Sequence, residues 1–256
     1  MLVVPHWSRP GDVTLAESKS GVRATVTPRD NLVYPADGPW PPAELGKKLC
    51  GSAWTGATPE DDRAPRQTER SYCALQSLNS EDAVTYSVFG TLSRMPRSEK
   101  REVFGRMFAS LGLPLAVDEP QVRFWTRVPH PDKPSAVTSG PELDVSIYAG
   151  DTLVIGEAKW NSKIDIKQGT SKERDQITLR VAHAKRLLRE VHSQVQNVMV
   201  LAIGRTIESL GKIANDPEIP VRRITWDEIV AWFPPSMQAE FQDYFRWRDL
   251  YAQRPG

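Results

Sequence analysis

The chain has 256 residues, enough for one domain with an appendage or for two small domains. Its 33 basic and 32 acidic residues leave a formal net charge of +1, so any affinity for a polyanion must come from local patches. Two cysteines, Cys50 and Cys73, are too few for a disulfide framework or a cysteine-rich zinc site. The longest apolar run, 198–203, is far shorter than the ~18–20 residues of a membrane span, and no secretory signal is visible at the start. We therefore expect a cytoplasmic protein that has no membrane partner.

The first 70 residues are rich in proline. Nine of the 21 prolines lie there, and proline removes main-chain donors and fixes φ. The stretch offers one plausible strand, 21–26, and no helical periodicity of useful length. We predict an irregular N-terminal extension over 1–70, with residues 71–256 forming the main domain.

From residue 79 onward the pattern alternates between helical and strand-like segments. Asn79 to Asp82 combine a side-chain cap with acids that suit the start of a helix, and Gly112 suits the end of the next one. Alternation predicts a strand at 121–128, and apolar runs predict strands at 143–148, 153–160, 198–203 and 221–225. Apolar residues at helical spacing predict a long helix over 172–195, with Ile177, Val181, Ala184, Leu188, Val191 and Val195 as its buried stripe. Shorter helices are predicted at 227–233 and 237–251.

A tight hairpin is predicted around Gly150-Asp151, because glycine supplies the positive φ that a two-residue loop needs. With Ala149 facing Thr152, the same register places Asp144 directly opposite Glu157. Paired residues of an antiparallel ladder have Cβ atoms about 4.5–5.5 Å apart on one face, so the two carboxylates would repel each other. A hard divalent cation with oxygen ligands would remove that conflict. Lys159 lies two residues beyond Glu157 and is therefore expected on the same face.

Glu142-Leu-Asp144, followed after twelve residues by Glu157-Ala-Lys159, resembles the D…(D/E)-x-K signature of the PD-(D/E)XK, or restriction-endonuclease-like, nuclease superfamily. The predicted order of elements over residues 79–203 is similar to that superfamily's αβββαβ core. The proline that often precedes the first aspartate is Leu143 here, a departure from the pattern. The resemblance implies an α/β fold whose central mixed sheet is flanked by helices, with the irregular N-terminal extension added to it.

The resemblance also implies roles for individual residues. Asp144, Glu157 and the Ala158 carbonyl would hold Mg²⁺, for which Mn²⁺ could substitute, and Lys159 would orient or activate the attacking water. Glu81, at the start of the first helix, would supply a further acid to the metal. Gln176, at the start of the long helix, would position the lysine or a phosphate.

Each of these residues also has a simpler reading. Asp144 and Glu157 could be surface acids, and Glu142 could form an ordinary cross-strand ion pair with Lys159. An acid such as Glu81 is favoured in a first helical turn by the dipole alone, and Gln176 could be solvated. Basic residues of the long helix, among them Lys172, Arg174 and Arg180, could follow a nucleic-acid backbone or form a solvated face. We assign no role to His183 or His192.

The leading hypothesis is a Mg²⁺-dependent phosphodiesterase that hydrolyses nucleic acid, with DNA preferred and endonuclease action expected. The alternatives are a nuclease-fold subunit that grips nucleic acid or a protein partner without cutting, and a nuclease directed at RNA. Fold-level analogy favours defence against foreign DNA. A homodimer is compatible with this hypothesis, although no residue argues for it.

Overall fold

In the computed structural model of the chain, the described residues are 1–18, 21–50, 73–114, 119–130, 140–162, 164, 175–190, 194–213 and 215–252. Contacts between Cα atoms divide the chain into two compact units. Unit 1 comprises Met1–Thr91 and Pro235–Gly256, and unit 2 comprises Leu92–Pro234. The boundary that we predicted near residue 70 lies outside the described residues. In the described part of the chain, no helix is both long enough and apolar enough to cross a membrane.

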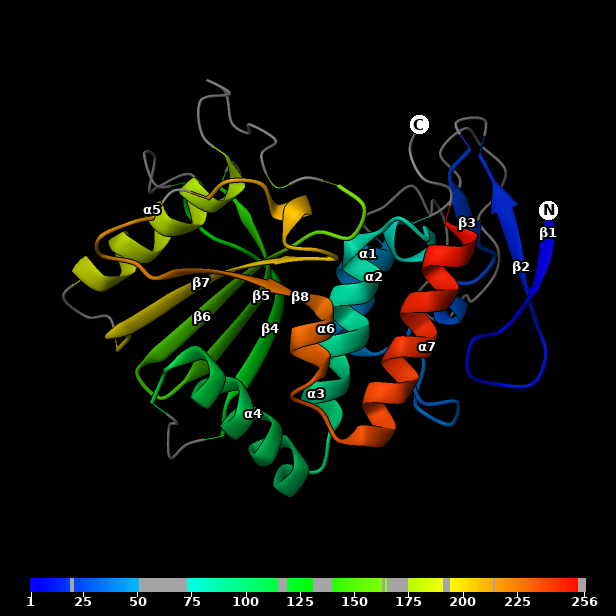
Figure 1. Ribbon diagram of the computed structural model, residues 1–256, viewed down its shortest axis with the longest axis horizontal. Helices are drawn as coiled ribbons and strands as arrows, with labels where there is room; N and C mark the ends of the chain where they lie inside the picture. The colour runs from blue at the N-terminus through cyan, green and yellow to red at the C-terminus, as the bar shows by residue number, and fades with distance from the viewer. Residues whose placement is uncertain are drawn as a thin grey trace. The chain divides into compact units, whose positions relative to one another are not determined.

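Unit 2 is built on a five-stranded mixed sheet in the order β4-β5-β6-β7-β8 (Figure 1). β4, β5 and β6 are antiparallel neighbours, whereas β6, β7 and β8 run parallel. This confirms a mixed α/β architecture with a mixed central sheet. The strands are β4 (Gln121–Arg127), β5 (Glu142–Ala149), β6 (Thr152–Ala158), β7 (Asn197–Gly204) and β8 (Val221–Thr225).

Helices lie on both faces of this sheet, with α4 (Arg97–Leu111) on one and α5 (Gln176–Arg189) on the other (Figure 1). α4 ends as predicted, because Gly112 has φ 69° and adopts the left-handed conformation. A short helix, α6 (Trp226–Val230), follows β8 directly and begins with a capping box between Thr225 and Glu228. A 3₁₀ turn, Glu208–Leu210, follows β7.

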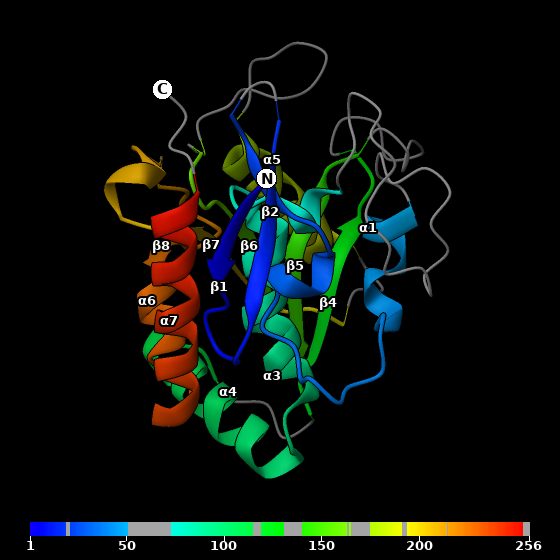
Figure 2. The same cartoon turned by 90° about the vertical axis from the view of Figure 1, so that its right-hand side faces the viewer.

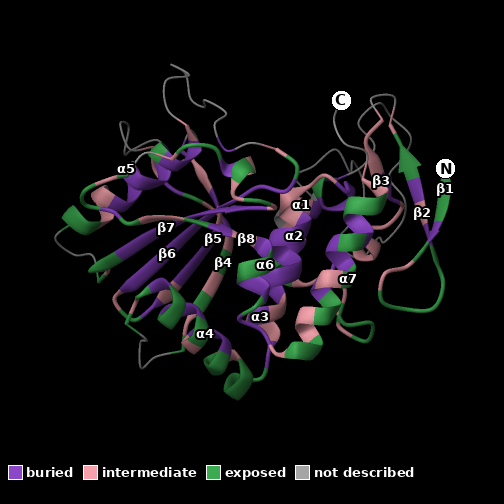
Figure 3. Cartoon of the chain, viewed as in Figure 1, coloured by how far each residue is buried: buried purple, intermediate pink, exposed green. Residues whose placement is uncertain are grey.

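The core under α5 joins one face of β6 and β7 to the apolar stripe of the helix. Alternate residues of the two central strands contact this stripe, and both strands are buried almost along their full length (Figure 3). The contacting residues are Leu153, Ile155, Val200 and Ala202 from the strands and Ile177, Val181 and Ala184 from α5. The predicted stripe is wrong at Leu188, which is 36% exposed one residue before the helix ends. Val191 lies outside the described residues, and Val195 lies after the helix, partly buried against the same core.

The hairpin between β5 and β6 has the predicted register. Ala149 pairs with Thr152, and the ladder continues to Val145 and Gly156. Gly150 has φ 60°, the positive value that the tight loop was expected to require. The two carboxylates that motivated the prediction occupy the next positions along each strand.

Unit 1 contains a three-stranded antiparallel sheet, β1 (Leu2–Pro5), β2 (Asp12–Glu17) and β3 (Arg23–Thr25). We predicted only the last of these strands. The C-terminal helix α7 (Pro235–Tyr251) lies beside this sheet (Figure 2). Their shared core is formed by Val4, Val13, Leu15, Leu78 and Trp247.

The remaining helical elements of unit 1 are short. The predicted helix after Asn79 begins at Glu81 with Ser80 as N-cap, but the Ser80 side chain makes no capping bond. It continues as one helical segment through a π-helical turn. The elements are α1 (Gly46–Cys50), α2 (Glu81–Thr85), the π-helical Tyr86–Gly90, α3 (Thr91–Arg94), which crosses the boundary between the units, and the 3₁₀ turns Pro28–Asn31, Ala43–Leu45 and Ala74–Gln76.

Buried polar contacts bind α7 to the N-terminal segment of unit 1. Arg248 is completely buried and donates to the carbonyls of Leu78 and Ser80 at 2.6 and 2.8 Å. It also donates to Asn31 Oδ1 at 2.7 Å and to the Tyr244 hydroxyl at 3.0 Å. These bonds satisfy carbonyls just before α2 and hold the last turn of α7 in place.

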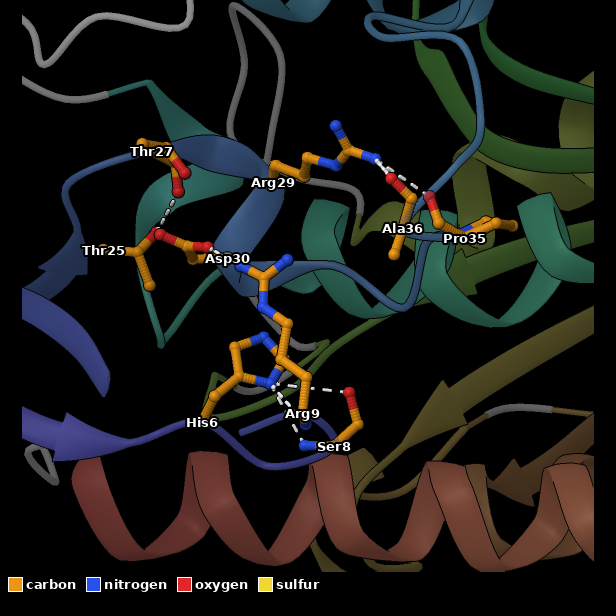
Figure 4. A network of polar contacts seen from close by, with 9 residues as sticks. All are labelled: His6, Ser8, Arg9, Thr25, Thr27, Arg29, Asp30, Pro35 and Ala36. Atoms are coloured by element: carbon orange, nitrogen blue, oxygen red, sulfur yellow. Dashed lines mark hydrogen bonds and ion pairs between the residues drawn. The ribbon is translucent and has the colours of Figure 1, made fainter. Parts of the chain in front are cut away.

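A more exposed polar network links the loops of unit 1 (Figure 4). Arg9 forms an ion pair with Asp30, and Arg29 donates to main-chain carbonyls of the proline-rich turn that follows it. The Nδ1 atom of His6 accepts bonds from the main-chain N–H groups of Ser8 and Arg9 at 3.1 and 3.3 Å. Burial and the neighbouring Arg9 lower the pKa of His6 to about 4, so the ring is a neutral acceptor at pH 7.

Candidate active site

The candidate site lies where the β5–β6 ladder ends. After the pair Val145 and Gly156, the main-chain N–H of Ala158 donates to Asp144 Oδ2 at 2.8 Å. A side-chain carboxylate therefore takes a donor that a continuing ladder would give to a main-chain carbonyl. Asp144 is thereby fixed against the last residue of β6.

The main-chain carbonyl of Ala158 faces the same edge as Asp144. The N–H of Lys159 donates to Ile203 O of β7 at 2.8 Å. Because successive residues of a strand direct their main-chain groups to opposite sides, both groups of Ala158 face β5. The carbonyl that the resemblance assigns to the metal thus lies on the side where Asp144 lies.

A glycine immediately before Glu157 allows close packing at this point. A Cβ atom on Gly156 would lie 2.5 Å from Val145 Cγ1 and 3.1 Å from Ile203 Cδ1. Both neighbours come from the strands on either side of β6. The sequence therefore uses a residue without a side chain where three strands meet beside the candidate site.

Glu157 is the centre of a buried ionic cluster. Its side chain is fully buried, and Lys159 and Arg180 are only 4% and 2% exposed. Lys159 Nζ lies 3.0 Å from Glu157 Oε1, and Arg180 Nη2 lies 2.5 Å from Glu157 Oε2. The expected proximity of Lys159 to Glu157 is thus confirmed. Glu142, which we considered as an alternative partner of Lys159, forms an ion pair with Arg127, with Oε2 and Nη2 3.3 Å apart.

Arg180 connects the long helix to both strands of the hairpin. Besides its contact with Glu157 on β6, its Nη2 atom donates to the main-chain carbonyl of Glu142 on β5 at 2.7 Å. We predicted a contact between this arginine and nucleic acid, and that remains a prediction. Its side chain is buried in the ionic cluster and does not lie on the exposed face of α5.

The charges of the cluster balance without a metal ion. Asp144 and Glu157 supply two negative charges, and Lys159 and Arg180 supply two positive ones. The two carboxylates therefore do not need a divalent cation to offset their repulsion, because Lys159 and Arg180 supply the positive charge. A metal ion has to be argued from the donor atoms.

The donor atoms do fit a hard cation. Asp144, Glu157 and the carbonyl of Ala158 offer only oxygen, the ligand that Mg²⁺ prefers, and they belong to the two strands that part here. Among the described residues, no group of three or more His, Cys, Asp or Glu side chains could hold a metal ion. The predicted set has two carboxylates and one carbonyl, with water and phosphate as the other ligands.

Gln176 lies on the same face of α5 as Arg180 and is only 7% exposed. The solvated alternative for this glutamine is therefore wrong. Its Oε1 atom, and the Nε and Nη1 atoms of Arg180, are buried without a hydrogen-bond partner in the described part of the chain. Asp175 caps the helix by accepting the Thr178 N–H at 2.7 Å. Lys172 and Arg174 lie outside the described residues.

Glu81 belongs to unit 1, whereas the other predicted site residues belong to unit 2. It is the first residue of α2, where its charge acts on the buried Arg248. Burial lowers the pKa of Arg248, and the Tyr244 hydroxyl and the Glu81 carboxylate oppose that shift. The predicted contribution of Glu81 to the metal remains a prediction.

Two further residues near the site were not assigned a role from the sequence. The indole Nε1 of Trp226 donates to the main-chain carbonyl of Lys159 at 2.9 Å, which fixes the backbone that carries the lysine. His183, one turn after Arg180 on α5, is 5% exposed, and burial followed by the charges of Arg186 and Arg180 lowers its pKa to about 4. The spacing of Gln176, Arg180 and His183 along one helix face was the available signal for a buried polar stripe.

Comparison of the chain with models of protein families, with curated proteins and with solved structures finds no match. What these residues do chemically is therefore inferred from their geometry.

Proposed function

We propose that this chain is a metal-dependent nuclease that hydrolyses phosphodiester bonds in nucleic acid, with DNA as its first substrate. The observation that supports this proposal is the meeting of Asp144, Glu157 and Lys159 with the Ala158 carbonyl at the point where β5 and β6 part. Two carboxylates, a carbonyl and an amine are the groups that the D…(D/E)-x-K chemistry requires. Within the class of mixed α/β proteins, the proposal assigns the chain a restriction-endonuclease-like core.

The proposed roles follow from the position of each group. Asp144, Glu157 and Ala158 would hold Mg²⁺, which when bound lowers the pKa of a water ligand and neutralises phosphate oxygens. Lys159 carries its amine beside Glu157, where it would orient the attacking water and bind a phosphate oxygen. Gln176 offers a buried acceptor on the face of α5 that carries Arg180, and this acceptor would orient that water or the lysine.

The experiment is a cleavage assay on plasmid DNA, single-stranded DNA and RNA with Mg²⁺ or Mn²⁺. The wild type is expected to cleave DNA, and Asp144→Asn and Lys159→Met are expected to lower the rate at least about 100-fold, as loss of a metal ligand or of a group that stabilises charge does. Glu99→Gln, a change at an exposed acid of α4, is the matched control and should cleave like the wild type. Cleavage that persists in both site variants would contradict the proposal.

A second candidate is a nuclease-fold subunit that binds nucleic acid or a protein partner without cutting. The observation that favours it is that Asp144, Glu157, Lys159 and Arg180 carry two charges of each sign, with Glu157 paired to both cations. DNA binding in EDTA without cleavage in Mg²⁺ or Mn²⁺ would support it. If only RNA is cleaved, the substrate of the proposed nuclease is RNA, and the proposed metal-dependent hydrolysis stands.

A further inference from the structure

Arg180 forms an ion pair with Glu157, whose carboxylate the proposed function assigns to a metal ion. Its Nη2 atom lies 2.5 Å from Glu157 Oε2, while Lys159 Nζ lies 3.0 Å from Glu157 Oε1. Both oxygens of Glu157 therefore already face a cation. A second bond from Arg180, to the Glu142 carbonyl at 2.7 Å, ties the guanidinium to β5.

A divalent ion at Asp144 and Glu157 would meet this guanidinium at close range. Like charges a few ångströms apart in a buried site repel strongly, because little water is present to screen them. The ion would also have to share or replace the bond from Arg180 to Oε2 of Glu157. In this cluster, metal binding and the Arg180–Glu157 ion pair are therefore competing events.

The guanidinium also has donors to spare. Its Nε and Nη1 atoms are buried, and the part of the chain that is described offers them no hydrogen-bond acceptor. Gln176, whose Oε1 atom has no hydrogen-bond donor within the described ranges, lies on the same helix face. A guanidinium whose Nε and Nη1 have no acceptor among the described residues, and whose Nη2 binds a carboxylate, is suited to exchange that carboxylate for an anionic phosphate oxygen.

We propose that Arg180 is a built-in counter-charge that holds Glu157 in the metal-free protein and that a metal ion must displace from that carboxylate. The inference rests on the proposed function, because it takes Asp144 and Glu157 as metal ligands. In the step of metal binding, Arg180 acts through Glu157 and sets the metal affinity. Once Glu157 binds the metal, Arg180 is free to hold a phosphate oxygen of the substrate.

The test is direct binding of Mn²⁺, followed by the loss of the electron paramagnetic resonance signal of the free ion, with no nucleic acid present. Arg180→Gln is expected to lower the Kd for Mn²⁺ at least about ten-fold, since it removes one positive charge next to the ion. Arg189→Gln removes the same charge from an exposed position on the same helix and should leave the Kd unchanged. Adding Asp144→Asn to Arg180→Gln should abolish the gain.

Arg180→Lys is the second variant, in case the glutamine variant does not fold. Lysine keeps the charge but ends in a compact ammonium on a shorter side chain, which does not extend to the position of Nη2 between Glu157 and the Glu142 carbonyl, so about a three-fold tighter Kd is expected. Circular dichroism and thermal melting of each variant establish that it is folded before binding is measured.

The outcomes separate this inference from the proposed function. Binding that depends on Asp144 but is equal in wild type and the Arg180 variants overturns the counter-charge and leaves the nuclease intact. Weaker binding in the variants also overturns it, because Arg180 would then support Glu157 as a ligand. If no protein binds Mn²⁺ through Asp144, the metal site of the proposed function fails, and the inference fails with it.

Discussion

The buried ion pairs around Glu157 predict a large loss of stability when the negative charge of this residue is removed. Glu157→Gln keeps the shape of the side chain and one carbonyl oxygen, but it leaves Lys159 and Arg180 as buried cations beside it, 4% and 2% exposed. Breaking a buried pair by removing one partner costs about 3–5 kcal/mol, because the remaining charge is uncompensated. For a chain of this size the melting temperature should fall by about 6–20 °C.

The assay is urea or thermal unfolding at pH 7, monitored by circular dichroism, with a double-variant cycle. Glu157→Gln combined with Arg180→Met removes one charge of each sign, so it should recover at least about half of the loss. Glu218→Gln, which removes an exposed acid paired with Arg189, is the control and should change the free energy of unfolding by less than about 0.5 kcal/mol. A Glu157→Gln variant within about 1 kcal/mol of the wild type would refute the description of this cluster as a buried, mutually dependent set of ion pairs.

Three further predictions concern packing, pH and the core of unit 1. Gly156→Ala should lower the free energy of unfolding, measured by chemical denaturation, by about 1–3 kcal/mol, because the new Cβ would lie 2.5 Å from Val145 Cγ1. An unchanged midpoint of the denaturation curve would contradict this. The pKa of His183 is lowered to about 4 in the folded protein, so the unfolded chain binds this proton at a higher pH than the folded one. The contribution of His183 to the free energy of unfolding should therefore be constant above pH 6.5 and fall between pH 6.5 and 4. The loss should reach about 2 kcal/mol at pH 5. His183→Gln should flatten that part of the stability profile, leaving the share due to His6, and a profile as steep as that of the wild type would exclude His183 as the cause. Arg248→Met should lower the free energy of unfolding by at least about 3 kcal/mol, because Asn31 Oδ1 and the carbonyls of Leu78 and Ser80 lose their donor. The measurement is the unfolding transition that includes unit 1.

The hairpin register and the position of Lys159 could be predicted because their signals are local. A glycine in a two-residue loop fixes which residues face each other, and the period of a strand then places Glu157 and Lys159 on one side. Strand β8 and the end of α4 at Gly112 were predictable for the same reason. Each of these features depends on residues that are close together in the sequence.

The pairing of Arg180 with Glu157 could not be predicted, because it joins residues 23 positions apart through the packing of α5 on β6. The same limitation applies to α7, which groups with the N-terminal segment through long-range contacts such as the hydrogen bond from the Trp247 indole N–H to the Pro5 carbonyl at 2.9 Å. The strand β2 is different, since Val13 and Leu15 alternate with Asp12 and Thr14 and are both 1% exposed. That alternation is a local signal for a strand, but the prolines of the same stretch favour the irregular chain that we predicted there.

The most direct measurement for the proposed function is anomalous diffraction from crystals of wild type and of Arg180→Gln soaked in Mn²⁺. We expect a peak about 2 Å from a carboxylate oxygen of Asp144 and from the Ala158 carbonyl oxygen, with the Glu157 carboxylate turned to the ion. The peak should be stronger in the variant. Saturating Mn²⁺ with no peak at this edge of the sheet in either crystal, and with Glu157 still bonded to Lys159, would contradict the assignment of a metal-dependent hydrolytic site.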